Sequence, residues 1–375
     1  MILTNAKIVT EIKVILGTIY LEGNKIKKIT NKIDKKGIDL KGKYVLPGFI
    51  DLHTHGGYGY DFMDGKHPKL NEYIKCVTSE GVTTVVRTTM TQTKDNIKKA
   101  LNAIRDVNNQ LFKFAHIEGP FISKNKCGAQ DPALIVTPSV KLFDELNSSS
   151  GNQIKICTTA IENDENFSFT KNLLKRKVVV SLGHTSINHD TAFEAFEKHK
   201  VNHVTHFFNA MTQFTHQDPG AVAAVFNSRK PKVELICDGI HVNKNIIKAT
   251  YGILGFKNIM LITDSMRAKG LKDGDYEIGG QKVIKKGMEA RLEKNNALAG
   301  SVATFDYCFK NIIKFTNCSI IEASWMASTN QAINLGIDKM LGSIKVGKIA
   351  NLTIMDSKYN VTKTILEGQT VFGGK

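Results

Sequence analysis

The chain has 375 residues, of which 42% are hydrophobic, and it carries a formal net charge of +16 at pH 7. Such a composition provides a large core and excludes an intrinsically disordered protein. No apolar run approaches the length of a membrane span, and residues 1–7 lack the basic start and apolar stretch of a signal peptide. The length fits one large α/β barrel with a small accessory domain, or two domains.

The lysines and cysteines indicate the surroundings of the protein. The lysines are spread along the chain in short groups such as Lys27-Lys28, Lys35-Lys36 and Lys285-Lys286. Without a basic helix or an RNA-binding motif, they predict solvated faces and no nucleic-acid partner, and binding on charge alone is the alternative. Their positive field would attract an anionic substrate. The six cysteines include no Cys-x-x-Cys pair and are typical of reduced thiols in a cytoplasmic protein.

Both ends of the chain have the residues of β-strands. Residues 6–10 and 17–22 contain β-branched and aromatic residues, and Gly23-Asn24 supplies a turn. Residues 350–355 and 362–372 show the same pattern. Because the middle of the chain is patterned differently, we expect the two ends to pair into one small sheet domain.

The middle of the chain alternates apolar strands with helical stretches. One strand enters His53, and seven more are expected at residues 82–87, 113–117, 154–159, 177–182, 203–207, 232–237 and 258–263. Helix-like segments lie between them, such as residues 95–108, 189–199 and 244–254. Repeated strand–helix units predict an α/β protein with a parallel sheet, and eight of them predict a (β/α)8 TIM-like barrel.

Ionisable side chains stand where these strands end. Five apolar runs are followed directly by Glu118, His184, His206, Asp238 and Asp264. His53 and His55 are one residue apart, a spacing that puts two imidazoles on the same face of a strand. A surface loop with two ordinary histidines is the alternative for that pair. Because the carboxyl ends of barrel strands gather on one face, we expect these side chains to meet in an active site.

Imidazoles and a carboxylate suit a divalent metal. The candidate ligands for one or two ions are His53, His55, Glu118, His184 and His206. Zinc is expected first, and iron, manganese and cobalt also fit such a set. A metal of this kind lowers the pKa of water toward roughly 7 and so prepares it to attack a carbonyl. Asp264 would accept the proton and pass it to a departing amine. The alternative for Asp264 is a helix cap.

The motifs at these strand ends resemble those of a known family. Residues 47–55, PGFIDLHTH, are similar to the opening motif of the amidohydrolase superfamily. Narrower motifs resemble the N-acetylglucosamine-6-phosphate deacetylases, and these are HIEGPF (116–121), SLGHT (181–185), HFFNAM (206–211), DGIHV (238–242) and LAGS (298–301). The resemblance covers nearly the whole chain, with the motifs in order.

The resemblance implies hydrolysis of N-acetyl-D-glucosamine 6-phosphate to D-glucosamine 6-phosphate and acetate by a homodimer. It also implies a barrel over residues 46–344 and a small β-sandwich domain built from residues 1–45 and 345–375. The principal metal ligands would be Glu118, His184 and His206, with His53 and His55 as the pair for a second ion and Asp264 as the catalytic acid–base. Sugar-phosphate contacts would come from Ala129, Gln130, Asn209, Ala210, Asp238, His241, Leu298, Ala299 and Gly300.

Three positions depart from the pattern of the family that the chain resembles. Gln217 stands where many members have an arginine that binds phosphate, so Gln217 is expected to make a weaker phosphate contact. Some members have histidine at the position of Gln130, and Cys127 replaces a commonly basic residue. These changes leave the hydrolytic centre intact and leave the phosphate contacts, and the exact N-acetyl compound, open.

Two other functions fit part of the pattern. An amidohydrolase that acts on a cyclic amide, such as a dihydroorotase or a hydantoinase, would bridge two metals with a carboxylated lysine. Lys155, in the strand at residues 154–159, is the candidate, although Glu118 already fills a bridging role. A non-catalytic scaffold on the same fold would have lost ligands that this chain keeps.

Overall fold

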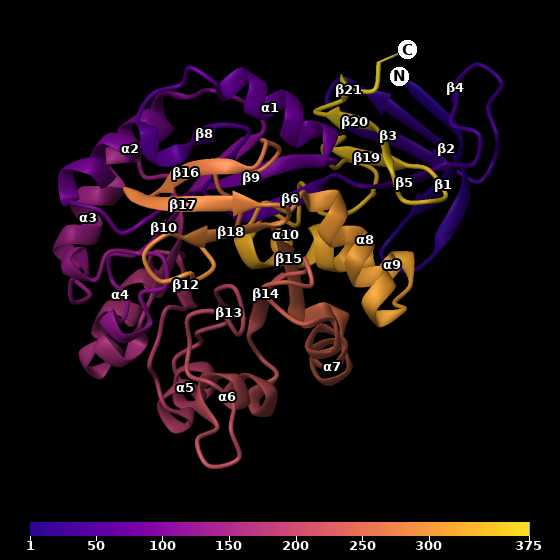
Figure 1. Ribbon diagram of the computed structural model, residues 1–375. Helices are drawn as coiled ribbons and strands as arrows, with labels where there is room; N and C mark the ends of the chain where they lie inside the picture. Colours follow the sequence, from indigo (N-terminus) through magenta and orange to yellow (C-terminus); the bar gives the residue numbers. More distant parts are fainter. Residues whose placement is uncertain (375) are drawn as a thin grey trace.

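The computed structural model describes residues 1–374, and its centre is an eight-stranded parallel sheet that nearly closes into a barrel (Figure 1). The strands pair in the order β6 (Phe49–Thr54), β9 (Val82–Thr89), β10 (Phe112–Glu118), β11 (Ile154–Thr159), β12 (Val179–Leu182), β13 (His203–Val204), β14 (Lys232–Ile236) and β15 (Ile259–Ile262). The Asp264 backbone N–H donates to the His53 carbonyl at 2.9 Å, which brings the exit of β15 to β6. The predicted (β/α)8 barrel is confirmed.

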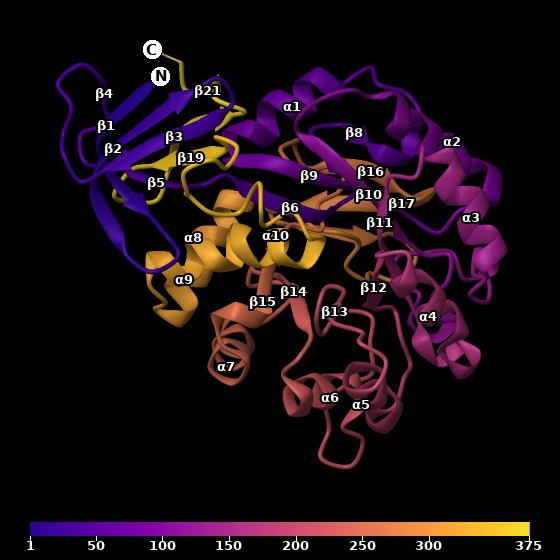
Figure 2. The ribbon, with the colours of Figure 1, turned by 180° about the vertical axis from the view of Figure 1, so that it is seen from behind.

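Helices follow the barrel strands along the chain and lie around the barrel (Figure 2). They are α1 (Leu70–Ser79), α2 (Lys94–Asp106), α3 (Val140–Ser149), α4 (Ser168–Lys175), α5 (His189–Glu197), α6 (Gly220–Ser228), α7 (Lys244–Leu254) and α8 (Phe305–Thr316). Thr93 caps α2 by accepting a hydrogen bond from the Asn96 amide. The apolar residues of α2 recur every three or four positions, so one face is buried against the barrel: Ile97, Ala100, Leu101 and Ile104.

Most predicted barrel strands differ from the observed ones by one or two residues at an end. The exception is the strand predicted at 203–207, because β13 ends at Val204. The backbone leaves the extended region there, with φ of +26° at His206 and +76° at Phe208. The apolar run therefore continues into a turn that points polar groups at the barrel mouth.

The two chain ends form a second sheet beside the barrel, as predicted, and the N and C labels lie together in Figure 1. Its strands are β1 (Ile2–Val9), β2 (Val14–Glu22), β3 (Lys25–Thr30), β4 (Ile38–Asp39), β5 (Tyr44–Pro47), β19 (Leu352–Met355), β20 (Val361–Leu366) and β21 (Gln369–Phe372). β5 pairs antiparallel with β19, which joins the two ends. A bridge between Lys25 and Ile349 folds the sheet over a separate apolar core, as in a small β-sandwich. The residues at which one domain gives way to the other stay a prediction.

A three-stranded sheet that the sequence patterns did not indicate lies in front of the barrel in Figure 1. It consists of β16 (Gly274–Ile278), β17 (Gln281–Lys286) and β18 (Glu289–Leu292). Its small core faces the barrel mouth and includes Ile278, Val283 and Met90. The Gln92 side-chain amide donates to the Gly279 carbonyl at 2.8 Å and ties the hairpin to the loop after β9.

The remaining elements are short. They are β7 (Gly56–Gly57), β8 (Tyr60–Asp61), α9 (Ile320–Ser324), a π-helical turn at Trp325–Thr329, α10 (Asn330–Leu335), and 3-10 turns at Phe62–Asp64, Lys124–Lys126, Pro132–Leu134, Ile161–Asn163, Glu165–Phe167 and Phe256–Asn258. Every helix within residues 1–374 is too short or too polar to cross a membrane.

Candidate active site

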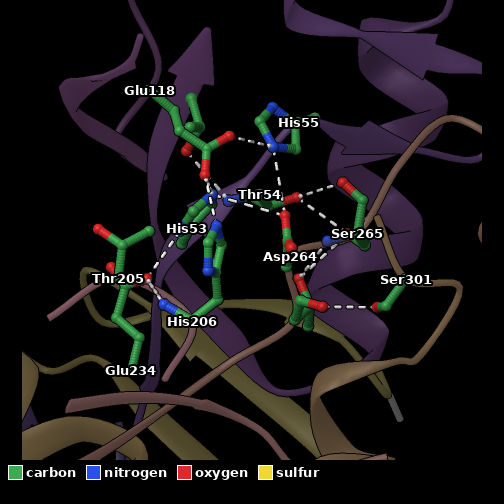
Figure 3. A network of polar contacts seen from close by, with 12 residues as sticks. His53, Thr54, His55, Glu118, Thr205, His206, Glu234, Asp264, Ser265 and Ser301 are labelled. Atoms are coloured by element: carbon green, nitrogen blue, oxygen red, sulfur yellow. Dashed lines mark hydrogen bonds and ion pairs between the residues drawn. The ribbon is translucent and has the colours of Figure 1, made fainter. Parts of the chain in front are cut away.

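Glu118, His184 and His206 form a compact group at the carboxyl end of the barrel strands. Figure 3 shows Glu118 and His206 of this group facing each other. His206 Nε2 lies 2.9 Å from Glu118 Oε1 and 3.0 Å from His184 Nε2, and His184 Nε2 lies 3.2 Å from the same oxygen. All three side chains are buried. Two imidazole nitrogens and a carboxylate oxygen at this spacing fit a divalent transition metal such as zinc. The fold thus brings together the three side chains that the sequence predicted as metal ligands.

The chain turns sharply where these side chains enter the centre. His184, His206 and Asp264 have φ angles of +46°, +26° and +49°. Few residues other than glycine adopt this left-handed region, because it crowds Cβ against the backbone. Such strain concentrates at functional sites, where the surrounding structure holds it. The backbone therefore points to the same three strand ends as the side chains.

Hydrogen bonds from neighbouring residues orient the side chains of the first ligand group, which consists of Glu118, His184 and His206. His184 Nδ1–H donates to the Lys126 carbonyl at 2.8 Å, which leaves the Nε2 lone pair facing the centre. The Gln130 amide donates to Glu118 Oε2 at 3.2 Å, while its own oxygen accepts the Thr91 backbone N–H at 2.8 Å. The Gln130 side chain thus fixes the position of the Glu118 carboxylate.

His53, His55 and Asp264 form a second group of possible ligands on the other side of Glu118. His55 Nε2 lies 3.3 Å from Glu118 Oε2 and 3.2 Å from Asp264 Oδ1. His53 Nε2 lies 3.3 Å from Glu118 Oε1 and 3.5 Å from Asp264 Oδ1. Glu118 lies between the two groups, and the second ion expected for the HTH motif stays a prediction.

Opposite charges in this buried cluster shift its pKa values. Burial alone would raise the pKa of Glu118, yet His53 and His184 hold it well below its usual range. Burial likewise opposes ionisation of Asp264, and His53 and His55 lower its pKa. Burial would lower the pKa of His55, but hydrogen bonds to Asp264 and Glu118 raise it to about 9. Both carboxylates are therefore anionic at neutral pH, as metal binding and proton acceptance require.

Asp264 is held by the backbone at the exit of β15. Its N–H donates to His53, and its carbonyl accepts the Ser301 N–H at 2.7 Å. No helix begins at Asp264, because the next helix after β15 within the described residues is α8. The alternative of a helix cap is therefore excluded, and the carboxylate faces the centre (Figure 3).

A cavity of about 240 Å³ opens above these groups. Twelve predicted site residues line it: His55, Glu118, Ala129, Gln130, His184, His206, Asn209, Ala210, His241, Asp264, Leu298 and Gly300. Hydrolytic and sugar-binding candidates from distant parts of the sequence therefore share one cavity.

Four predicted site residues lie elsewhere. His53 is fully buried beneath the cavity, and Ala299 is buried behind its wall. Asp238 orients His241, because its carboxylate accepts the His241 backbone N–H at 2.9 Å and Nδ1–H at 2.7 Å. Gln217 is exposed on the loop at residues 212–219 and is absent from the cavity wall of its own chain.

Sequence reasoning missed five residues at the centre. Met90, Gly128, Ile278 and Ala297 line the cavity, and Glu234 lies beneath it. Glu234 had a usable signal, because a charged residue within the apolar segment of β14 must find partners when it is buried. No sequence pattern marked Ile278, because this residue belongs to the three-stranded sheet that the sequence did not predict.

Lys155 lies on the outside of the barrel wall. Its Nζ donates to the Lys177 carbonyl, 2.9 Å away at the start of the segment that leads into β12. A carboxylated lysine that bridges two metals would have to point into the barrel mouth. This placement argues against the cyclic-amide hydrolases that use such a lysine.

Comparison with known proteins extends these observations over the whole chain. Residues 44–371 match the model of the amidohydrolase family. The N-acetylglucosamine-6-phosphate deacetylase of Bacillus subtilis is 36% identical, over 100% of this chain and 98% of the relative. The crystal structure of the N-acetylglucosamine-6-phosphate deacetylase of Thermotoga maritima is 34% identical with a TM-score of 0.90, and 99% of each chain is covered.

A second solved structure is a mutant of N-acetyl-D-glucosamine-6-phosphate deacetylase from Mycobacterium smegmatis in complex with N-acetyl-D-glucosamine-6-phosphate. It is 26% identical with a TM-score of 0.94, and 99% of each chain is covered. The barrel, the convergent ligand groups and these full-length similarities agree. The chain therefore belongs to the amidohydrolase family, among the N-acetylglucosamine-6-phosphate deacetylases.

Proposed function

We propose that this chain hydrolyses the acetamide of N-acetyl-D-glucosamine 6-phosphate to D-glucosamine 6-phosphate and acetate. The observation that carries the proposal is the shared cavity, in which Asp264 and the Glu118 group face the sugar-binding candidates. Full-length similarity to deacetylases with this substrate in their names supports the choice of sugar.

We propose that Glu118, His184 and His206 would hold the first divalent ion, and that His53 and His55 would hold a second one beside Glu118. The nitrogen and oxygen donors favour zinc, with iron, manganese or cobalt as alternatives. When bound, such an ion polarises a carbonyl and activates water for attack at neutral pH. The protein supplies the burial and the fixed direction of each donor.

Asp264 moves the proton in the proposed reaction. Its carboxylate, 3.2 Å from His55 and open to the cavity, takes a proton from the water that attacks the acetamide carbon. When the C–N bond breaks, Asp264 returns this proton to the leaving nitrogen. The free amine and acetic acid result, the acid releases its proton to solvent as acetate, and Asp264 is again ionised for the next cycle.

The sugar and its phosphate occupy the outer part of the cavity in this proposal. Ala129, Gln130, Asn209, Ala210, Leu298, Ala299 and Gly300 surround the sugar. His241, held by Asp238, contacts the phosphate. A homodimer would complete this side: Phe214 is 60% exposed in a surface hollow that His241 also lines, so a partner subunit has an apolar face to cover. The six unpaired cysteines support a cytoplasmic location.

An acetate-release assay tests the proposal with three substrates: N-acetylglucosamine 6-phosphate, its galactose epimer and unphosphorylated N-acetylglucosamine. We expect the first to be preferred, chelation to abolish release, and added metal to restore it. Full activity in demonstrably metal-free protein would contradict the metal centre. Equal rates with and without the phosphate would indicate that the enzyme deacetylates another N-acetyl compound, consistent with the neutral Gln217.

A further inference from the structure

Glu234 is a fully buried carboxylate beneath the two ligand groups. It lies in the middle of β14, between Val233 and Leu235, which pack in the apolar core around the barrel. Side chains alternate along a strand, so Glu234 points to the opposite side, into the barrel. Within residues 1–374 it pairs with no lysine or arginine, and its ion-pair partners are histidines. A buried carboxylate needs such donors to persist.

Three donors occupy its two oxygens. Oε2 accepts His53 Nδ1–H at 2.7 Å and the His206 backbone N–H at 3.0 Å, and Oε1 accepts His203 Nε2–H at 3.0 Å. Figure 3 shows Glu234 reaching His53 and His206 from the same side. One carboxylate therefore touches a member of each ligand group.

The contact to His53 decides which ring nitrogen carries the proton. An ionised carboxylate only accepts, so His53 must present Nδ1–H to Glu234. In the neutral imidazole that metal binding requires, the Nε2 lone pair then faces Glu118 and Asp264, whose oxygens lie 3.3 and 3.5 Å away. A cation placed between this nitrogen and the two carboxylates would contact all three groups.

The contact to His206 holds a strained backbone. His206 has a φ of +26°, and its N–H, which the end of β13 leaves without a strand partner, is taken by the Glu234 side chain. The next amide, Phe207 N–H, donates to the Glu234 backbone carbonyl at 2.8 Å. The same residue thus fixes the turn from which the His206 imidazole enters the first group.

We propose that Glu234 is the positioning residue that prepares both ligand groups for metal, by setting the tautomer of His53 and the backbone turn of His206. The inference rests on the metal centre in the proposed function. A purely structural role would require only that the buried carboxylate be satisfied, whichever way the His53 ring presented its nitrogens.

The test is metal affinity in the Glu234→Gln variant, measured by competition between the protein and a chromophoric chelator for zinc. The amide keeps the shape but offers one accepting oxygen for three donors. We expect zinc to bind about 10- to 100-fold more weakly, the usual loss for an outer partner of a metal ligand. The matched control is Thr158→Val, which breaks buried hydrogen bonds to His116 and Thr205 without touching Glu234.

The control should lose stability but keep wild-type zinc affinity. An unchanged affinity in Glu234→Gln, or an equal loss in Thr158→Val, would overturn the inference. In a His53→Asn background, Glu234→Gln should cost less additional affinity than in the wild type, because part of its effect passes through His53. Full additivity would contradict the role assigned to that contact.

A measurement on the wild type covers the case in which Glu234→Gln does not fold. In the zinc-loaded wild type, a long-range ¹H–¹⁵N correlation spectrum should show His53 with its proton on Nδ1, and His53→Asn identifies the signal. A proton on Nε2 would overturn the inference. A wild type that binds no zinc would instead contradict the proposed function itself, so the two failures are distinguishable.

Discussion

The proposed hydrolytic side of the cavity and the proposed phosphate side differ in how neighbouring residues fix their side chains. On the hydrolytic side, Glu118, Asp264 and their histidines are buried and contact one another within about 3.5 Å. On the phosphate side, His241 has one firm partner, Asp238, and Gln217 is exposed outside the cavity wall. The proposed chemical centre is therefore complete within one chain, whereas the proposed phosphate contacts lie on loops, where a second subunit would add to them.

The largest effect on activity is expected from a substitution on the hydrolytic side. Asp264→Asn keeps the shape but cannot accept a proton, so kcat should fall at least about a hundredfold, with little change in KM. Steady-state acetate release measures it, with metal content and circular dichroism as controls, because Asp264 also contacts His53 and His55. A folded, metal-loaded variant with unchanged kcat would refute the assignment.

Glu118→Gln should strongly weaken metal binding on the same side of the cavity. Its carboxylate contacts both ligand groups, so the loss of affinity should exceed the roughly 10- to 100-fold that an outer partner costs. Equilibrium dialysis followed by elemental analysis measures the ions bound per chain. Wild-type stoichiometry at limiting metal would show that Glu118 is not a ligand.

His241→Ala probes the phosphate side and should have a smaller effect. Hydrogen bonds to a charged group contribute about 1.5–3 kcal/mol, so KM for the 6-phosphate sugar should rise about tenfold or more. The unphosphorylated sugar is the internal control and should be little affected. Equal weakening of both sugars would remove His241 from phosphate binding and place it at the sugar.

Gln217→Arg should give the smallest effect, and in the favourable direction. A guanidinium adds charge and a bidentate donor, so KM for the phosphorylated sugar should fall a few-fold. Added salt should reduce that gain, because it screens charges on an exposed loop. No change at any salt concentration would mean that position 217 lies away from the bound phosphate.

The contrast between the buried centre and the exposed loops also explains what the sequence could predict. The barrel was predictable because its strands are apolar runs. The candidate site residues were found because ionisable side chains such as Glu118 and Asp264 stand where some of these runs end. Glu234 was missed, because one charge inside an apolar run does not reveal which side chains meet it. The β16–β18 sheet was missed, because its alternately exposed strands contain lysine and glutamate as loops do. Gln217 lies on an exposed loop, and no local pattern predicts what such a loop contacts.

The pairing of β5 with β19 has a consequence for biosynthesis. Val45 lies opposite Ile354, so a strand made early must wait for one made almost last. While the ribosome adds the residues between them, β5 has an unpaired edge that can join other chains. Contacts this far apart also close slowly. We expect nascent chains to be most prone to aggregation shortly before synthesis ends, and chaperones that bind exposed strands to matter most then.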